Sequence, residues 1–213
     1  MFNLYLAYSE CRDMIKHVEI DSAIMFGFDS ELLKKCVDAL NSARAAIAIV
    51  PRAIHQVSED TIDTCLKKSR YLLNGCIPSD TISARKLAKL GATVTIVLTP
   101  TSLKFIDESQ INVMAQTPTP RYLEIHLYQF LTHLVNYQNI DVEKEFYYLG
   151  TVIERALKND VAVIPSASSP NIRKAILVNH IDLVLYSMGF SRRERRLMLE
   201  FYPMDLVQRW LKT

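Results

Sequence analysis

A chain of 213 residues with 49% hydrophobic composition can bury a large core, and single-domain barrels often reach this length, so we expect one domain over residues 1–213. The net charge is only +2, and no run of about 18 apolar residues occurs, which excludes a membrane-spanning helix and predicts no membrane partner. The first residues lack both a charged leader and a cleavage site, so a cytoplasmic or nuclear protein is expected.

Apolar, β-branched segments recur along the chain and alternate with segments of helical spacing, a pattern typical of alternating strands and helices. Short connections after nearly every strand allow either a (β/α) barrel or an open, doubly wound sheet, and the pattern alone does not separate them. The expected strands are residues 2–8, 22–28, 45–51, 71–77, 93–99, 121–128 and 161–167.

Two helices are expected in the first third of the chain, each from a capping residue at its start. A helix over 29–40 begins at Asp29 or Ser30. A helix over 58–70 takes Ser58 as its N-cap and has acidic residues in its first turn, where the helix dipole favours them.

Two further helices follow. One runs from Ser79 or Asp80 to Gly91, a residue type preferred just past a helix end. The longest covers residues 141–160 and has a single apolar face, which we expect to be core. The residues of that face are Phe146, Leu149, Ile153 and Leu157.

The cysteines, histidines and glycines give no local sign of a metal or cofactor site. The cysteines contain no C-x-x-C pair, so we expect reduced, packed thiols rather than zinc ligands or a disulfide scaffold. The histidines are scattered, and the glycines are too far apart for a phosphate-binding loop or a dinucleotide turn. We therefore expect no catalytic residue, no metal and no cofactor bound by the chain itself. The cysteines are Cys11, Cys36, Cys65 and Cys76.

Glu124 and His126 keep an enzymatic alternative open. They are two residues apart on an expected strand, so their side chains share a face and form either a buried polar pair or an acid/base or metal pair. No second carboxylate or histidine lies nearby in the sequence to complete a site. Together with His55 at the strand ends, they would make a metal-dependent phosphoesterase, the main alternative function.

Charge is unevenly distributed along the chain. Between Leu66 and Lys104 seven cations face the single anion Asp80, which gives this block a charge of +6. Residues 164–198 are also basic, with six cations against two anions. If the two basic blocks meet in space, they form one positive face suited to a nucleic acid.

The second basic block begins with the turn after the last expected strand. Ser166, Ser168 and Ser169 lie where that strand ends and a helix is expected to begin, and Arg173 and Lys174 follow. Hydroxyls, free N–H groups and cations in such a place favour an anion. The same residues also fit a capped helix with two solvated cations, and the segment alone leaves both interpretations open.

An arginine-rich helix start closes the block. Ser191 and Glu194 have capping-box spacing, and four arginines lie in the first turn and a half, where positive charge opposes the helix dipole. A phosphate backbone, an acidic protein surface or a merely solubilising face would each explain them. They are Arg192, Arg193, Arg195 and Arg196.

The order of these motifs resembles one family, ribonuclease P protein component 3, the thirty-kilodalton-subunit family of archaea and eukaryotes. The resemblance covers nearly the whole chain and rests on "MFNLYLAY", "LKKSR", "ARKLAKLGATVTIVLTP", "RYLEIHLYQFL", "VIPSASS" and the closing "IDLVLYSMGFSRRERRLMLEFYPMDLVQR". Several positions depart from the family pattern, among them Asn3, His126, Val178 and His180.

The resemblance implies an α/β fold, a TIM-like (β/α) barrel related to the polymerase and histidinol phosphatase superfamily but without its metal ligands. It implies a protein subunit of ribonuclease P that binds and activates the catalytic RNA, which removes the 5′ leader from precursor tRNA. In such a particle the RNA is the catalyst and holds Mg²⁺, so the chain belongs to an endonuclease without itself cleaving RNA.

The resemblance also implies partners and contacts. The partners are ribonuclease P RNA, protein component 2 directly, components 1 and 4 in the same particle, and precursor tRNA as substrate. A cytoplasmic location follows, or a nuclear one in a eukaryote, and the lack of a basic tail favours an archaeal source. The expected RNA-binding residues are Arg70, Arg85, Lys86, Lys104, Ser166, Arg173 and Lys174, with Arg192, Arg193, Arg195 and Arg196 as RNA or partner contacts.

Overall fold

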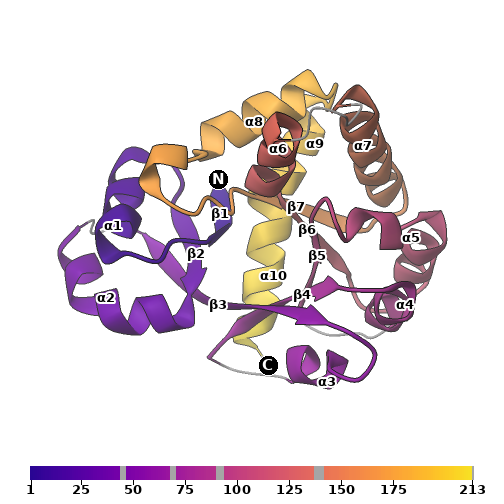
Figure 1. Cartoon of the computed structure of the whole chain (residues 1–213), viewed down its shortest axis with the longest axis horizontal. Coiled ribbons are helices and arrows are strands. Elements are labelled where there is room, and N and C mark those ends of the chain that lie inside the picture. The colour runs from indigo at the N-terminus through magenta and orange to yellow at the C-terminus, as the bar shows by residue number, and fades with distance from the viewer. Residues whose placement is uncertain (44–46, 68–70, 90–93, 137–141, 213) are drawn as a thin grey trace. The chain divides into compact units, whose positions relative to one another are not determined.

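Among the residues that the structure describes, seven strands form a sheet, and all seven were predicted from the sequence (Figure 1). The computed structural model describes residues 1–43, 47–67, 71–89, 94–136 and 142–212. The strands lie in the sheet in the same order as in the sequence, β1-β2-β3-β4-β5-β6-β7. The strands are β1 (Phe2–Leu6), β2 (Met25–Asp29), β3 (Ala48–Val57), β4 (Leu73–Pro78), β5 (Thr95–Leu98), β6 (Tyr122–His126) and β7 (Ala162–Ser166).

The strands are parallel, and helical segments connect them. The pairings β1·β2, β2·β3, β4·β5 and β5·β6 are all parallel. Parallel strands in chain order with helical connections are the topology of a TIM-like (β/α) barrel rather than of a doubly wound sheet, in which the strand order reverses. The predicted fold class is therefore confirmed.

The helices include the four predicted between residues 29 and 160, although with other bounds, and several that the sequence pattern did not reveal. In the described part of the chain, none is long and apolar enough to cross a membrane. They are α1 (Cys11–Ile20), α2 (Ser30–Ala43), α3 (Ile62–Leu66), α4 (Thr81–Lys89), α5 (Glu108–Ala115), α6 (Leu127–Asn136), α7 (Val142–Lys158), α8 (Val178–Ser187), α9 (Arg192–Arg196) and α10 (Tyr202–Leu211), with short turns η1 (Leu103–Phe105), η2 (Ile172–Lys174) and η3 (Leu197–Phe201).

Aspartate caps fix the starts of two predicted helices. The N–H groups of Glu31 and Leu32 donate to Asp29 Oδ1 at 2.9 and 3.2 Å at the start of α2. The Ser83 N–H donates to Asp80 Oδ1 at 2.7 Å at the start of α4. Each cap satisfies N–H groups that have no partner within the helix.

The start predicted for the helix after β3 is wrong. Ser58 is not its N-cap: α3 begins at Ile62, and the backbone N–H of Ser58 instead donates to Thr61 Oγ1 at 2.9 Å. Strand β3 runs on to Val57, several residues beyond its predicted end, so a turn from Ser58 to Thr61 precedes the helix. The extended strand leaves α3 only five residues.

The prediction of reduced, packed thiols is also wrong, because the four cysteines form two disulfides. Cys11 at the start of α1 pairs with Cys36 in α2, and Cys65 in α3 pairs with Cys76 in β4. The two bridges join residues 25 and 11 positions apart, with Cα atoms 5.4 and 6.0 Å apart. Each bridge therefore ties neighbouring elements together, which spacing in the sequence did not reveal.

The chain divides into two compact units. The first comprises Met1–Ala53, Ser69–Leu73 and Pro165–Thr213, and the second comprises Ile54–Lys68 and Asn74–Ile164. In the first unit β1 and β2 approach so closely that a Cβ on Gly27 would lie 1.8 Å from the carbonyl oxygen of Leu4, so only glycine fits there.

Each unit has its own apolar core. In the first, Leu4 and Phe26 on neighbouring strands are fully buried, as are Met14 and Val18 on α1. In the second, the core includes α7, where Leu149 and Ile153 are buried as predicted; Phe146 and Leu157 are only half-buried. Val152 and Ala156 complete the buried face of that helix.

Candidate nucleic-acid interface

The turn from Ser166 to Lys174 does not begin a helix, contrary to prediction. Only the short turn η2 (Ile172–Lys174) follows β7, and α8 starts at Val178. Ser168 has a positive φ of 51°, a conformation that non-glycine residues adopt rarely and that bends the chain back toward β1. The segment is therefore a compact turn rather than the N-terminus of a long helix.

Hydrogen bonds to β1 hold this turn. The Ala167 N–H donates to Asn3 Oδ1 at 3.0 Å, and the Ser168 N–H donates to the Tyr5 carbonyl at 2.9 Å. These amides are thus engaged within the protein. The three hydroxyls are also buried, so burial favours a bracing role for them over direct contact with phosphate; they belong to Ser166, Ser168 and Ser169.

A buried polar network supports the turn from below. Tyr8 Oη lies 2.5 Å from His17 Nδ1, and His17 Nε2 lies 2.9 Å from Asp21 Oδ2. Asp21 also accepts the Val178 N–H at 3.1 Å and the Asn3 side-chain amide at 3.5 Å. The four side chains are buried. The network therefore joins β1, α1 and the start of α8.

Charge and burial set the protonation of this network. Burial raises the pKa of the Asp21 carboxyl, but the hydrogen bond and charge of His17 and the N–H donors of Val178 and Ala23 outweigh it, so this pKa lies below its ordinary value. Burial, with Asp21 and another nearby carboxylate, raises the pKa of the Tyr8 phenol above its ordinary value. Tyr8 thus keeps its proton, and the ring of His17 lies within hydrogen-bond distance of both partners, with Nδ1 next to Tyr8 and Nε2 next to Asp21.

A hollow of about 400 Å³ lies beside the braced turn, between α1 and η2. Arg12 and Lys16, one turn apart on α1, line it together with Arg173, and all three side chains are exposed. The Ile172 N–H donates to Asp13 Oδ2 at 3.1 Å and so fixes η2 against the helix. We call Arg12, Lys16 and Arg173 the α1–η2 cation cluster.

Only part of the α1–η2 cation cluster was predicted from the sequence. Arg173 was predicted, and Lys174 beside it is exposed as well. Arg12 and Lys16 were missed because α1 was not predicted; their spacing of four residues, which places both on one face of a helix, was the available signal. Glu10 and Asp13 also line the hollow, so its lining combines two carboxylates with three cations.

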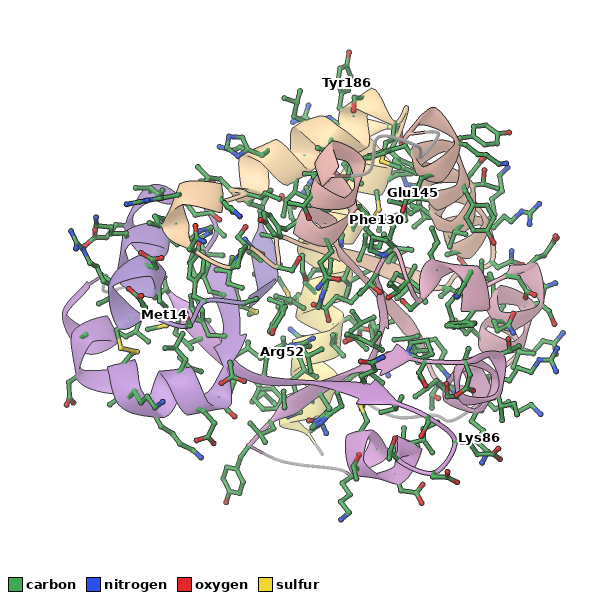
Figure 2. The ribbon with its side chains drawn as sticks, viewed as in Figure 1. Met14, Arg52, Lys86, Phe130, Glu145 and Tyr186 are labelled. Atoms are coloured by element: carbon green, nitrogen blue, oxygen red, sulfur yellow. A yellow bond between two sulfur atoms is a disulfide. The ribbon has the colours of Figure 1, made fainter. Side chains whose placement is uncertain are left out.

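The predicted cations of the second unit differ in their exposure and in whether they form an ion pair. Arg85 is exposed on α4, and Lys104 is exposed with its ammonium 5.0 Å from the centre of the Phe105 ring. Lys86 lies on the surface (Figure 2) and pairs with Glu59 at 2.7 Å, a bond that raises the pKa of Lys86. Arg85 and Lys104 are thus the freer cations of this group.

Two predictions about the basic blocks stay predictions. Arg70 lies outside the described residues. The expectation that the two basic blocks form one face concerns residues of both units, which are described separately.

The four C-terminal arginines fall into two kinds. The predicted capping box is present: the Ser191 N–H donates to Glu194 Oε2 at 2.7 Å, and the Glu194 N–H donates to Ser191 Oγ at 3.3 Å. Arg195 pairs with Asp182 at 2.7 Å and Arg196 pairs with Glu200 at 3.1 Å. The remaining two are exposed, with no ion pair to any residue the structure describes; they are Arg192 and Arg193.

The Glu124 and His126 pair lies buried in β6. Thr95 Oγ1 donates to Glu124 Oε2 at 2.6 Å, and His126 Nε2 lies 3.5 Å from Glu124 Oε1. Across the described ranges, no three His, Cys, Asp or Glu side chains lie close enough together to hold a metal ion. The arrangement has the form of a buried polar pair, and His55 does not join it into a described cluster.

Comparison with known proteins shows likeness in structure but not in sequence. No family model matches the chain, and no curated protein matches it. A chain of a solved cryo-EM structure, described as archaeal Ribonuclease P with mature tRNA, superposes with a TM-score of 0.71 at 12% identity, over 100% of this chain and 90% of that one. At this identity the likeness shows that the whole chain shares that chain's fold.

Proposed function

We propose that this protein is an RNA-binding subunit of a ribonuclease P particle. The observation that carries the proposal is the fold shared over its full length with a chain of the archaeal ribonuclease P structure that contains mature tRNA. The motif order that resembles protein component 3 is a second line of support and concerns the same family of particles. A fold alone hosts many functions, so the proposal also needs a surface that fits RNA.

The α1–η2 cation cluster supplies such a surface. Its three cations are exposed around one hollow, and hydrogen bonds within the protein hold both supporting segments. Phosphate groups of structured RNA fit cations fixed in this way, because contacts to the phosphate backbone position a protein without reading sequence. Ser166 and its neighbours act as a brace for Arg173 and Lys174.

The finer parts of the proposal concern partners, chemistry and location. The chain performs no bond cleavage; the particle's RNA holds Mg²⁺ and cleaves precursor tRNA, and component 2 is the direct protein partner, with components 1 and 4 nearby. The source is archaeal and the location cytoplasmic. Two disulfides agree with a cytoplasmic location only if the source is hyperthermophilic, because disulfides are otherwise rare in cytosolic proteins.

The test is to bind the purified protein to a ribonuclease P RNA transcript at several salt concentrations. We expect Arg12→Ala with Arg173→Ala to weaken binding and to reduce the slope of log affinity against log salt by roughly 1.4 to 1.8, because each lost phosphate contact contributes about 0.7 to 0.9. Lys34→Ala with Lys35→Ala removes the same charge from α2 and serves as the control. If both double variants show the same slope of log affinity against log salt, the α1–η2 cation cluster is not part of the RNA interface.

A further inference from the structure

The C-terminal helices present apolar side chains to solvent. On α8, Leu183 and Tyr186 are 63% and 64% exposed, and Figure 2 shows Tyr186 pointing outward. Near the junction of η3 and α10, Phe201 and Met204 are 53% and 42% exposed. Aliphatic and aromatic groups of this kind gain nothing from contact with phosphate, but they are typical of protein interfaces.

A hollow of about 660 Å³ opens beside Phe201. Its apolar lining is Leu197 and Phe201, and its charged lining is arginine alone. The guanidinium of Arg196 lies 5.7 Å from the centre of the Phe201 ring. We call this site the arginine hollow; it is lined by Arg192, Arg193, Arg196, Leu197 and Phe201.

Internal pairing makes this region a poor site for a polyanion. The carboxylates of Asp182, Glu200 and Asp205 lie at 2.7 to 3.1 Å from arginines of α9 and α10, namely Arg195, Arg196 and Arg209. They neutralise those arginines, so these pairs offer no net positive charge to an extended phosphate backbone. Two uncompensated cations remain at the hollow, Arg192 and Arg193.

Helix stability does not account for these two arginines. They occupy the first two positions of α9, directly after the N-cap Ser191, where positive charge opposes the helix dipole. Glu194 already satisfies the capping box. Two exposed guanidinium groups beside an exposed aromatic ring instead match the composition of interface hot spots, which are enriched in arginine and aromatic residues.

We propose that the arginine hollow binds an acidic segment of a partner protein, with an aromatic or aliphatic side chain against Leu197 and Phe201 and carboxylates at Arg192 and Arg193. Arginine recognises carboxylates through paired hydrogen bonds, so the complementarity is geometric as well as electrostatic. The site is separate from the α1–η2 cation cluster and does not depend on RNA binding there.

The test selects phage-displayed random short peptides on the full-length protein. Selected peptides are expected to combine Asp or Glu with Phe, Trp or Leu. Arg192→Glu with Arg193→Glu should weaken their binding at least about tenfold, as expected of hot-spot residues, and Phe201→Ala should weaken it as well. Fluorescence anisotropy of labelled peptides gives the affinities, and thermal unfolding confirms that each variant is folded.

Lys34→Glu with Lys35→Glu is the matched control, because it reverses two adjacent cations on another helix of the same unit and should leave peptide affinity unchanged. The proposal is overturned if selection yields no peptide that depends on Arg192 and Arg193, or if the dependent peptides lack acidic residues. It is also overturned if the charge reversal weakens binding of a transfer RNA transcript as strongly as it weakens the peptides, which would assign the hollow to RNA.

Discussion

Asp21 connects several segments of the first unit through its hydrogen bonds. Its carboxylate accepts hydrogen bonds from the side chains of His17 and Asn3 and from the backbone of Ala23 and Val178. These donors lie in β1, in α1, just before β2 and at the start of α8. A buried carboxylate with this many donors is favourable only while all of them remain in place.

We expect Asp21→Asn to lower the free energy of unfolding by about 3 kcal/mol at neutral pH, because the amide removes the charge and cannot accept all the donors. The folded pKa of Asp21 lies below its ordinary value, so its stabilisation is complete above the unfolded pKa and is lost as pH falls through the folded pKa. The gap between wild type and variant should therefore shrink below about pH 4.

Urea unfolding at a series of pH values measures this gap. Glu31→Gln on α2 is the control: Glu31 is an exposed carboxylate paired with Lys34, and pairs of that kind contribute little to stability. If the difference in free energy of unfolding between wild type and Asp21→Asn stays constant from neutral to acidic pH, the charge of the Asp21 carboxylate does not contribute to stability.

At the scale of elements, the start of a helix with an aspartate cap could be predicted from the sequence. A helix whose buried face mixes apolar and polar side chains could not. The start of α4 was predicted from Ser79 or Asp80 as the capping residue, and Asp80 is the residue that caps it. Helix α1 was missed because its buried face consists of Met14, His17 and Val18, so a histidine interrupts the apolar pattern. Met14 and Val18 have helical spacing by themselves, but His17 is recognisable as part of the same face only from its hydrogen-bond partners Tyr8 and Asp21.

The disulfides were unpredictable for a different reason. Four cysteines allow three pairings even when all are oxidised, and their spacing in the sequence carries no preference. What decides the pairing is the packing of α1 against α2, and of α3 beside β4, which exists only in the fold. The pairing is therefore a property of tertiary structure.

We expect Cys65→Ala with Cys76→Ala to lower the free energy of unfolding by about 3 kcal/mol, because the bridge closes a loop of 11 residues in the unfolded chain. Thermal unfolding with and without a reductant measures the effect. The wild type should lose stability on reduction, and the variant should lose less because only the Cys11 bridge remains. Mass spectrometry after alkylation that found four free thiols in the untreated protein would contradict both bridges.

At the scale of the whole molecule, the sequence predicted the fold class better than the binding surface. The seven strands were readable because each is an apolar run. Their order in the sheet was not readable from the pattern, which also allowed a doubly wound sheet, and the barrel was predicted from the family resemblance. Charge blocks identified Arg173 but not Arg12, because the hollow gathers residues from α1 and η2, more than 150 positions apart. A surface of that kind exists only after folding.

The second unit offers an independent check on RNA binding. We expect Arg85→Ala with Lys86→Ala to weaken binding to a ribonuclease P RNA transcript and to leave thermal unfolding unchanged. The reason is that Arg85 is exposed and the pair between Lys86 and Glu59 lies near the surface, where such pairs contribute little stability. If the variant melts at a lower temperature instead, α4 has a structural role and the binding result cannot be assigned to RNA contact.

The most direct test of the proposed function is to purify the tagged protein from its native cells in mild salt and to sequence the RNA that accompanies it. The account predicts enrichment of one structured RNA of the ribonuclease P type, together with cleavage of precursor tRNA by the purified particle. Recovery of the protein without any enriched RNA, and without precursor-tRNA cleavage, would contradict it and would reduce the likeness to ribonuclease P to one of fold alone.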